Sequence, residues 1–230
     1  MKKFLTLILL LNFNLNNAYS IQPDVFIQST VNRASDILSK NVSKEEKIDG
    51  LKIIAKETVD IKGIGFYSLG SVRKVLSDKQ IEKYFYLFEN YFLKSFSNRL
   101  SEYTNPKIEV QNKNVINRNY TIVNSVLVGT QDRPEVKIDW RVYTKNPENP
   151  LIRDLIIEGL SLARTQKEEF SSILNSNNNN IEALFKVLNK TFISSSFEFK
   201  IDANSSFCVL AKLSPSIIKS LIKGSLGFFV

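Results

Sequence analysis

The segment from Ser77 to Tyr103 constrains the fold most, because it carries eight aromatic residues without a proline or glycine. Ser77 and Gln80 have the spacing of an N-terminal capping box, so the segment is expected to form one long helix. Apolar residues recur along it at the helical period, in a stripe roughly 100° wide. The stripe comprises Ile81, Phe85, Phe88, Phe92, Phe96 and Tyr103, and Lys83, Asn90, Lys94, Ser97 and Ser101 lie opposite. Such a stripe must be covered, either by the protein's own sheet or by an apolar ligand.

The first twenty residues have the organisation of a secretory signal. Lys2 and Lys3 precede the apolar run Phe4–Leu11, and Ala18–Ser20 fits a cleavage site. The alternative is a transmembrane anchor, but the apolar run is well short of the ~20 residues that span a bilayer. We therefore expect a cleaved signal peptide at residues 1–20, one main domain at residues 21–190 and a C-terminal extension at residues 191–230.

Histidine and cysteine, which often serve as catalytic residues or metal ligands, are absent or nearly absent from the chain. The chain has no histidine and a single cysteine, Cys208. This composition removes Ser-His-Asp and Cys-His catalysis and His-ligated zinc, and one cysteine cannot form an intramolecular disulfide. We therefore expect a binding protein that needs no cofactor or metal, rather than an enzyme.

The chain is basic, with a formal net charge of +8, and removal of the two lysines in the signal peptide leaves +6. A basic surface could steer the protein to anionic lipid headgroups or to nucleic acid. The alternative is an ordinary solvated surface in a lysine-rich chain. No basic run resembles a nucleic-acid-binding arm, so no nucleic-acid partner is expected.

Periodicity predicts an α+β fold. Amphipathic helical patterns come first, four strand-like segments follow residue 106, and two short helices follow the strands. The second predicted helix follows the capping box Ser43–Glu46 and is interrupted at Gly63–Gly65. The other predicted helices are Pro23–Leu38, Phe66–Leu76, the aromatic helix, Arg164–Leu174 and Ile181–Leu188. The predicted strands are Lys107–Val110, Asn119–Val128, Glu135–Tyr143 and Leu151–Leu162. This order indicates helices packed on one face of a curved antiparallel sheet.

Three local patterns predict further details of the strands, helices and turns. Val136, Ile138, Trp140 and Val142 alternate with polar residues, as in a half-buried strand. Gly70 is expected inside a helix where another segment approaches the backbone closely. The run Asn175–Asn180 is expected to turn through left-handed conformations.

The last forty residues, Thr191–Val230, allow three interpretations. They contain two strand-like stretches and an apolar terminus. They could form an additional hairpin and helix, a membrane-touching tail, or an extension created by loss of an upstream stop codon. An apolar run of this length fits a buried or an interfacial segment equally well.

Three blocks in order resemble the MlaC family, also called the toluene-tolerance family of periplasmic phospholipid-binding proteins. The first runs from Phe66–Gly70 through the cap at Ser77–Gln80 into the aromatic helix. The second is the strand Arg133–Trp140, and the third is Asp154–Ser161 followed by a helix with the pair Glu169 and Phe170. The likeness covers about residues 22 to 190.

The resemblance implies a nuclear-transport-factor-2-like α+β fold that encloses an apolar pocket for phospholipid acyl chains. It also implies a carrier that moves phospholipid through the periplasm between an outer-membrane lipoprotein/porin complex and an inner-membrane ABC transporter complex. Such transport would maintain the lipid asymmetry of the outer membrane. The headgroup would remain near the pocket mouth.

Candidate lipid-contacting residues follow from the apolar stripe and the strands. They are Phe66, Leu69, Phe85, Phe88, Phe92, Phe96, Val126, Ile138, Trp140, Ile156 and Leu160. For each of them, an ordinary core position is the alternative. Arg73, Lys74 and Lys79 are candidates for contact with a lipid phosphate, although such residues are more often solvated.

Carboxylates raise two other possibilities. Asp154 and Glu158 share one face if the strand is continuous, so they could act as an acid/base pair; a buried hydrogen-bond and turn motif is the alternative. An isomerase or dehydratase on the same fold would use Asp139 or Asp154 as its base and a tyrosine as its acid. A secreted adaptor whose aromatic helix docks a partner helix is a further alternative.

Overall fold

The computed structural model describes residues 20–131 and 134–193. The predicted signal peptide, apart from Ser20, and residues 194–230 of the predicted extension lie outside the described residues. The helices are α2 (Pro23–Ser39), α3 (Lys44–Thr58), α4 (Ile61–Ser68), the 3-10 helix η1 (Val72–Lys74), α5 (Asp78–Leu100), α6 (Leu162–Asn175) and α7 (Ile181–Ile193). The strands are β1 (Ile108–Asn117), β2 (Tyr120–Leu127), β3 (Val136–Tyr143), β4 (Leu151–Ile157) and β5 (Leu160–Ser161).

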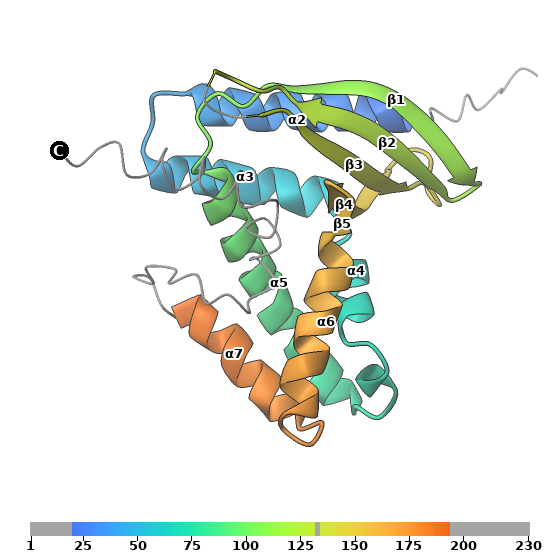
Figure 1. Cartoon of the computed structure of the whole chain (residues 1–230). Helices are drawn as coiled ribbons and strands as arrows, with labels where there is room; N and C mark the ends of the chain where they lie inside the picture. Colours follow the sequence, from blue (N-terminus) through green and yellow to red (C-terminus); the bar gives the residue numbers. More distant parts are fainter. Residues whose placement is uncertain (1–19, 132–133, 194–230) are drawn as a thin grey trace, which may run out of the picture.

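The five strands form one antiparallel sheet in the order β1-β2-β3-β4-β5. The sheet curves, α2 runs along one of its faces, and α3 lies beneath α2 (Figure 1). Helices α5, α6 and α7 extend away from the sheet as a second group (Figure 1). The predicted α+β class, with helices packed against an antiparallel sheet, is confirmed.

Both predicted capping boxes are present. The Ser77 hydroxyl accepts a hydrogen bond from the Gln80 backbone, and the Gln80 side chain accepts one from the Ser77 backbone. Ser43 and Glu46 make the same reciprocal pair at the start of α3. These bonds satisfy backbone donors that the first helical turn leaves free, so local sequence is enough to place both helix starts.

The glycines near residue 65 act differently from the prediction. Helix α4 runs straight through Gly63 and Gly65, and the chain breaks at Asp60, whose carboxylate accepts a hydrogen bond from the Gly63 backbone at 2.8 Å. Gly70 lies just after α4 with φ +59°, so it ends the helix instead of lying inside one. The close approach occurs at Gly65, where an added Cβ would lie 2.7 Å from Cδ1 of Phe88.

Two strand predictions need correction. Strand β1 extends to Asn117, seven residues beyond the predicted end, because its backbone pairs with β2 although its side chains are largely exposed. The predicted strand Leu151–Leu162 is divided by a tight turn at Glu158 and Gly159, whose φ angles are +48° and +83°. The alternation in β3 is confirmed, since Ile138, Trp140 and Val142 are buried.

Helix α5 is covered on more than one side. Tyr84 and Tyr91 pack against Phe170 of α6 with ring centroids 6.4 and 6.2 Å apart, and α7 also lies against α5. Ser97, on the side of α5 predicted to be polar, is fully buried. The helix ends at Leu100, three residues before the predicted end. At the α6–α7 turn, Asn178 and Asn179 have left-handed φ angles, as predicted.

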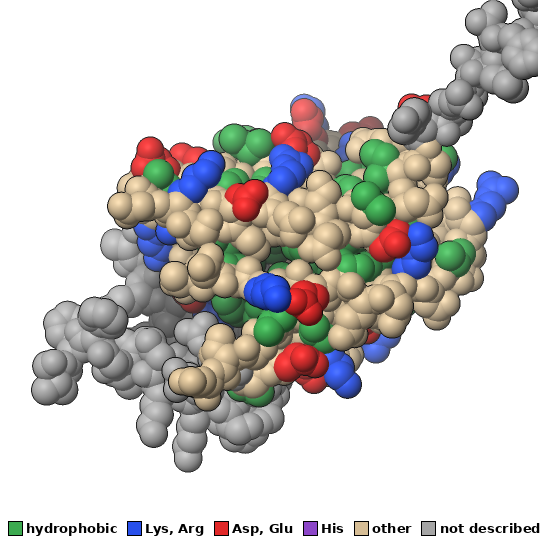
Figure 2. All heavy atoms as spheres, turned by 90° about the horizontal axis from the view of Figure 1, so that it is seen from above, with side chains coloured by type: hydrophobic (Ala, Val, Ile, Leu, Met, Phe, Trp, Pro, Cys, Tyr) green, Lys and Arg blue, Asp and Glu red, His purple; other side chains and the backbone are tan. Residues whose placement is uncertain are grey.

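The surface carries mixed charge. On the face seen from above, basic and acidic side chains lie close to one another, with hydrophobic side chains between them (Figure 2). Ion pairs between side chains of opposite charge, such as Arg33 with Glu57 and Lys113 with Asp24, occur at the surface. Within the described residues, no helix is long and apolar enough to cross a membrane, and no cluster of side chains suited to a metal ion occurs.

Candidate functional site

An apolar cavity of about 210 Å³ lies between the sheet and helices α2, α3 and α5. The first turn of α6 and α4 also reach it. Most of its wall is aliphatic or aromatic. The main apolar lining residues are Val31, Leu38, Leu51, Ile54, Ala55, Val59, Ile64, Phe88, Phe92, Phe96, Leu100, Ile108, Leu127, Ile138, Trp140, Ile152, Leu155, Ile157 and Leu162.

One wall is the aromatic side of α5. Phe88, Phe92 and Phe96 follow each other at four-residue spacing, so they lie one above another on the helix. Their rings are in contact, with centroids 6.1 Å apart for the first pair and 5.5 Å apart for the second. Burial decreases along this row, because Phe88 is 1% exposed whereas the other two are half-buried.

The facing wall comes from the inner face of the sheet. Trp140 is paired with Leu155, and Ile138 with Ile157, so four apolar side chains of β3 and β4 point the same way. The indole nitrogen of Trp140 donates a hydrogen bond to the Ser125 hydroxyl at 2.8 Å. The polar atom of the tryptophan is therefore satisfied within the sheet, which leaves its ring as apolar wall.

Three hydroxyl groups around the cavity also have hydrogen-bond partners within the protein. Thr30 and Thr58 donate to backbone carbonyls one helical turn earlier, at 2.8 and 2.7 Å. Ser35 donates to the carbonyl of Pro106 at 2.9 Å. An occupant of the cavity therefore meets mainly methyl, methylene and ring atoms, and such a cavity favours an apolar ligand over water.

Asp154 is the one carboxylate among the lining residues, and it is 4% exposed. One of its oxygens accepts a hydrogen bond from the Ser161 hydroxyl at 2.6 Å, and the other accepts one from the Ala163 backbone at 3.0 Å. Ser161 is the N-cap residue of α6. Asp154 thus fastens the start of α6 to β4, which agrees with the turn-motif alternative.

The acid/base pair that the sequence left possible is not assembled. Glu158 lies in the tight turn and accepts a hydrogen bond from the Lys137 backbone, whereas Asp154 is paired with Arg141. These two β3 positions are four residues apart, about 13 Å along a strand. Asp139 alternates with Ile138 and Trp140, so it lies on the other face of the sheet, where it accepts a hydrogen bond from Asn124.

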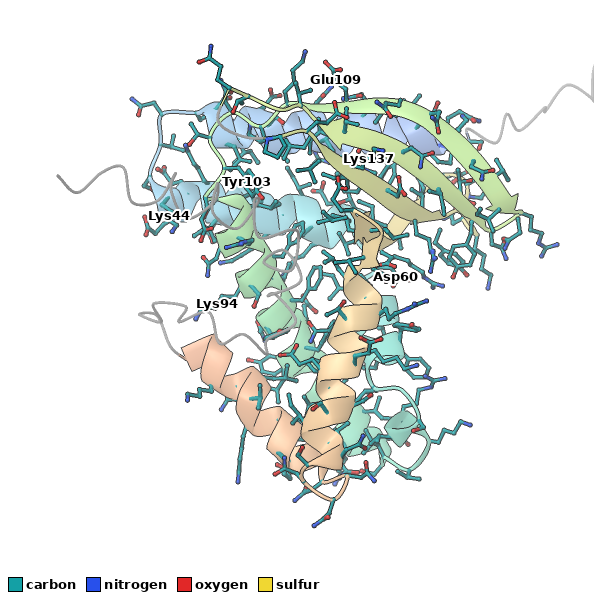
Figure 3. The ribbon with its side chains drawn as sticks, viewed as in Figure 1. Lys44, Asp60, Lys94, Tyr103, Glu109 and Lys137 are labelled. Atoms are coloured by element: carbon teal, nitrogen blue, oxygen red, sulfur yellow. The ribbon has the colours of Figure 1, made fainter. Side chains whose placement is uncertain are left out.

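Polar groups gather at one end of the cavity. Arg99 lines it from the last turn of α5, and Tyr103 and Pro106 line it from the segment after that helix. Tyr103 lies close to α3, below the level of α2 and the sheet (Figure 3). Arg99, Tyr103 and Pro106 are half-buried, so this end of the cavity lies at the protein surface.

Five of the eleven predicted lipid-contacting residues line the cavity. They are Phe88, Phe92, Phe96, Ile138 and Trp140. The structure therefore brings together the middle of the aromatic helix and the centre of β3, as the two patterns predicted. Because these α5 residues face the inside of the protein, the stripe is not a free surface on which a partner helix could dock.

The other six predicted residues lie elsewhere. Val126 and Ile156 belong to the opposite face of the sheet, and their neighbours Leu127, Leu155 and Ile157 take the lining positions. Among the remaining four, Leu69 is buried in the core, Phe66 stacks on Phe85 outside the cavity with 46% of its own surface exposed, and Leu160 is 39% exposed.

The predicted phosphate contacts lie at the N-terminal end of α5. Arg73 and Lys74 lie in η1, and Lys79 lies in the first turn of α5. Lys79 and Arg99 are twenty residues apart, which is about 30 Å along an α-helix. Arg73 instead lies over the ring of Phe66, 4.9 Å from its centroid. None of the three lines the cavity.

Sequence reasoning missed the contribution of α2 and α3, as well as Arg99. The apolar patterns of both helices are visible in the sequence, but nothing in them distinguishes a side chain that fills the core from one that borders a cavity. Arg99 carried a weak signal, because it falls three residues after Phe96 and therefore on the same side of the helix as the aromatic stripe.

The MlaC protein family matches residues 28–190. The chain belongs to the MlaC family. The matched residues span α2 to α7 and include every wall of the cavity. The resemblance seen in the three sequence blocks is therefore confirmed.

A solved structure shares this fold. It is a phospholipid-binding protein from Ralstonia solanacearum in complex with a phospholipid, and it superposes with a TM-score of 0.63 at 15% sequence identity. The similarity covers 75% of the present chain and 97% of the other. At this identity the comparison shows a common architecture. No curated protein matches the chain.

Proposed function

We propose that this protein carries phospholipid through the periplasm, with the acyl chains in the cavity between α5 and the sheet. The observation that carries the proposal is the cavity itself: its walls are mainly apolar, and the hydroxyl groups of Thr30, Ser35 and Thr58 are hydrogen-bonded within the protein. Membership of the MlaC family and the phospholipid bound to the Ralstonia protein support the same ligand class.

Acyl-chain burial explains why such a carrier needs partners. Each methylene removed from water contributes about 0.8 kcal/mol, so two acyl chains contribute well over roughly 10 kcal/mol. Spontaneous release into water would then be very slow. We propose that lipid exchange occurs at docking sites, on an outer-membrane lipoprotein/porin complex and on an inner-membrane ABC transporter complex, and that it maintains outer-membrane lipid asymmetry.

The proposed location depends on the N-terminal sequence. Two lysines, a short apolar run and a small-residue cleavage site at residues 18–20 are the features of a secretory signal. We propose that residues 1–20 direct export and are then removed. Mass spectrometry of the protein recovered from a periplasmic extract should find Ile21 at the N-terminus, and a chain that retains Met1 would contradict the proposal.

Native mass spectrometry tests the proposed ligand. Purified protein should carry phospholipid, and protein stripped of lipid should recover it from vesicles. Phe96→Asp should reduce retained lipid at least tenfold, because it places a carboxylate beside the acyl chains. Since Phe96 is half-buried, this variant is expected to keep its helical circular dichroism signal.

Tyr86→Asp is the matched control, because Tyr86 lies on the same helix, is 65% exposed and does not line the cavity. It should retain lipid like the unmodified protein. A lipid-free mass for the unmodified protein, together with no uptake from vesicles, would refute phospholipid carriage.

A further inference from the structure

The aromatic row on α5 ends in a cation. Phe88, Phe92, Phe96 and Arg99 follow each other at spacings of four, four and three residues, so all four lie on one side of the helix. Phe88 and Arg99 are eleven residues apart, which corresponds to about 16 Å along the helix axis. Over this length of α5, the cavity wall changes from aromatic to cationic.

Exposure changes in the same direction. Phe88 is 1% exposed, whereas 33% of the Arg99 side chain is exposed. Tyr103 and Pro106, which line the cavity beyond Arg99, are also half-buried. Arg99 therefore lies where the cavity meets water, and a ligand whose apolar part fills the cavity would place its polar part here.

The charges around the cavity also differ between its two ends. Arg99 is the one cation among the lining residues, and Asp154 is the one carboxylate. Asp154 lies on β4, and its carboxylate contacts the start of α6, whereas Arg99 is at the end of α5. The start of α6 and the C-terminal end of α5 are well separated in Figure 1. An anionic group is thus favoured at the Arg99 end and disfavoured at the Asp154 end.

Arg99 has donors to offer an anion. Its one described ion pair is with Glu102, at 3.2 Å, which lies just beyond the C-terminal end of α5, and 55% of the Glu102 side chain is exposed. Exposed pairs of this kind contribute little stability and exchange readily. A guanidinium carries five N–H donors in a planar fork, so it can bind a phosphate through two parallel hydrogen bonds.

We propose that Arg99 binds the phosphodiester of the phospholipid at the mouth of the cavity, and so sets the direction in which the lipid lies. The acyl chains then run from Arg99 past Phe96 and Phe92 towards Phe88. This inference rests on the proposed function and adds to it the residue that distinguishes a phospholipid from a neutral diacylglycerol.

The test compares lipids that share acyl chains but differ in the headgroup. Stripped protein is titrated with phosphatidylethanolamine, phosphatidylglycerol and diacylglycerol, each presented in mixed micelles. Arg99→Ala should lower affinity for both phospholipids about tenfold, because charge-assisted hydrogen bonds are lost, and should change diacylglycerol affinity less than twofold. Arg99→Gln, which keeps most of the side-chain length, should behave like Arg99→Ala.

Lys107→Ala is the control for general surface charge. Lys107 directly follows Pro106 and 72% of its side chain is exposed, but it does not line the cavity. It should leave the affinities for all three lipids within twofold of the unmodified protein. An equal loss in Lys107→Ala and Arg99→Ala would overturn the proposal in favour of a diffuse electrostatic effect.

Two further results would overturn it in different ways. A loss of diacylglycerol binding in Arg99→Ala as large as its loss of phospholipid binding, with binding largely retained in Arg99→Gln, would mean that Arg99 acts through its apolar stem and not through the phosphate. Failure of the unmodified protein to bind any of the three lipids would refute the proposed function itself, and this result is distinguishable because it does not depend on Arg99.

Discussion

Gly65 sets the distance between α4 and α5. Its carbonyl accepts a hydrogen bond from the buried Tyr84 hydroxyl at 2.9 Å, and an added Cβ would lie 2.7 Å from a Phe88 ring carbon. The pKa of Tyr84 is held well above its ordinary value because its hydroxyl is buried. Gly65 therefore positions the first ring of the cavity wall, although it does not line the cavity itself.

Gly65→Ala should lower the free energy of unfolding by about 1–3 kcal/mol, because the Phe88 ring would have to leave its packed position against Gly65. Chemical denaturation would measure this difference, provided that the variant and the unmodified protein have equal m-values. Gly50→Ala is the matched control within α3, since an added Cβ there meets the half-buried Ile37 side chain, which is nearest at its terminal Cδ1. The free energy of unfolding of the control should either stay unchanged or rise by up to about 1 kcal/mol, because alanine has the higher helix propensity. Equal losses in both variants would contradict the close-approach explanation.

Asp24 carries a pH-dependent contribution to stability. Its carboxylate accepts a hydrogen bond from the Lys113 ammonium at 2.7 Å, which joins the start of α2 to β1. This hydrogen bond lowers the pKa of Asp24 below its ordinary value of 3.8. A depressed carboxyl pKa stabilises the folded state above the unfolded pKa, and that contribution disappears as the pH falls through the folded value.

Asp24→Asn should therefore be less stable than the unmodified protein at neutral pH, by no more than about 1 kcal/mol because the pair is partly exposed. The difference should shrink below about pH 4. Urea unfolding at several pH values between 2.5 and 7 would measure it. A difference that does not vary with pH would show that the Lys113 contact does not stabilise the carboxylate.

At the level of elements, the junction between α3 and α4 is tied to the sheet through Asp60. One oxygen of Asp60 caps α4, and the other accepts a hydrogen bond from Arg153 of β4 at 2.5 Å. Arg153 also donates to the Tyr120 hydroxyl and lies 3.6 Å from the centroid of the Tyr143 ring. Burial disfavours the charged guanidinium and by itself would lower the pKa of Arg153. The hydrogen bonds with Asp60 and Tyr120 have the larger combined effect, so the pKa of Arg153 is raised above its ordinary value.

Asp60→Ala should lower the free energy of unfolding by about 2–4 kcal/mol, because it removes a helix cap and leaves a half-buried guanidinium without its carboxylate. Asp60→Asn should cost less, since an asparagine can still cap α4. Glu57→Gln is the control, because its pair with Arg33 is exposed, and it should change stability by less than about 0.5 kcal/mol. A loss for Asp60→Ala as small as that of the control would show that this junction does not depend on Asp60.

At the level of the whole molecule, the cavity couples lipid binding to stability. Its walls come from elements between α2 and α6, so an occupant contacts elements that are far apart in the sequence. A ligand that binds the folded state alone stabilises it by mass action, by about 2.7 kcal/mol at a hundredfold excess over Kd.

Lipid-loaded protein should accordingly unfold about 5–10 °C above stripped protein, because one kcal/mol moves the midpoint by about 2–4 °C in a domain of this size. Differential scanning calorimetry of the two forms would measure the shift. Phe96→Asp should show little or no shift in the presence of the same lipid. Identical midpoints for the loaded and stripped forms of the unmodified protein would contradict binding in the cavity.

Local patterns in the sequence were sufficient for much of the fold. The serine caps of α3 and α5, the alternation in β3 and the asparagine turn before α7 each depend on neighbours within a few residues, so the sequence predicts them directly. The three blocks that mark the family are also local. The helix-to-strand order that they imply is the order in the structure.

Contacts between distant segments determined the site. Because strand side chains alternate, a shift of one residue moves a side chain to the other face of the sheet, so Leu127 lines the cavity in place of Val126, and Leu155 and Ile157 in place of Ile156. Sequence alone also could not place the cavity mouth, since both ends of α5 carry arginine or lysine nearby. The packing of α2, α3 and the sheet around the C-terminal half of α5 places Arg99 at the opening, and Lys79 lies about 30 Å away from it along the helix.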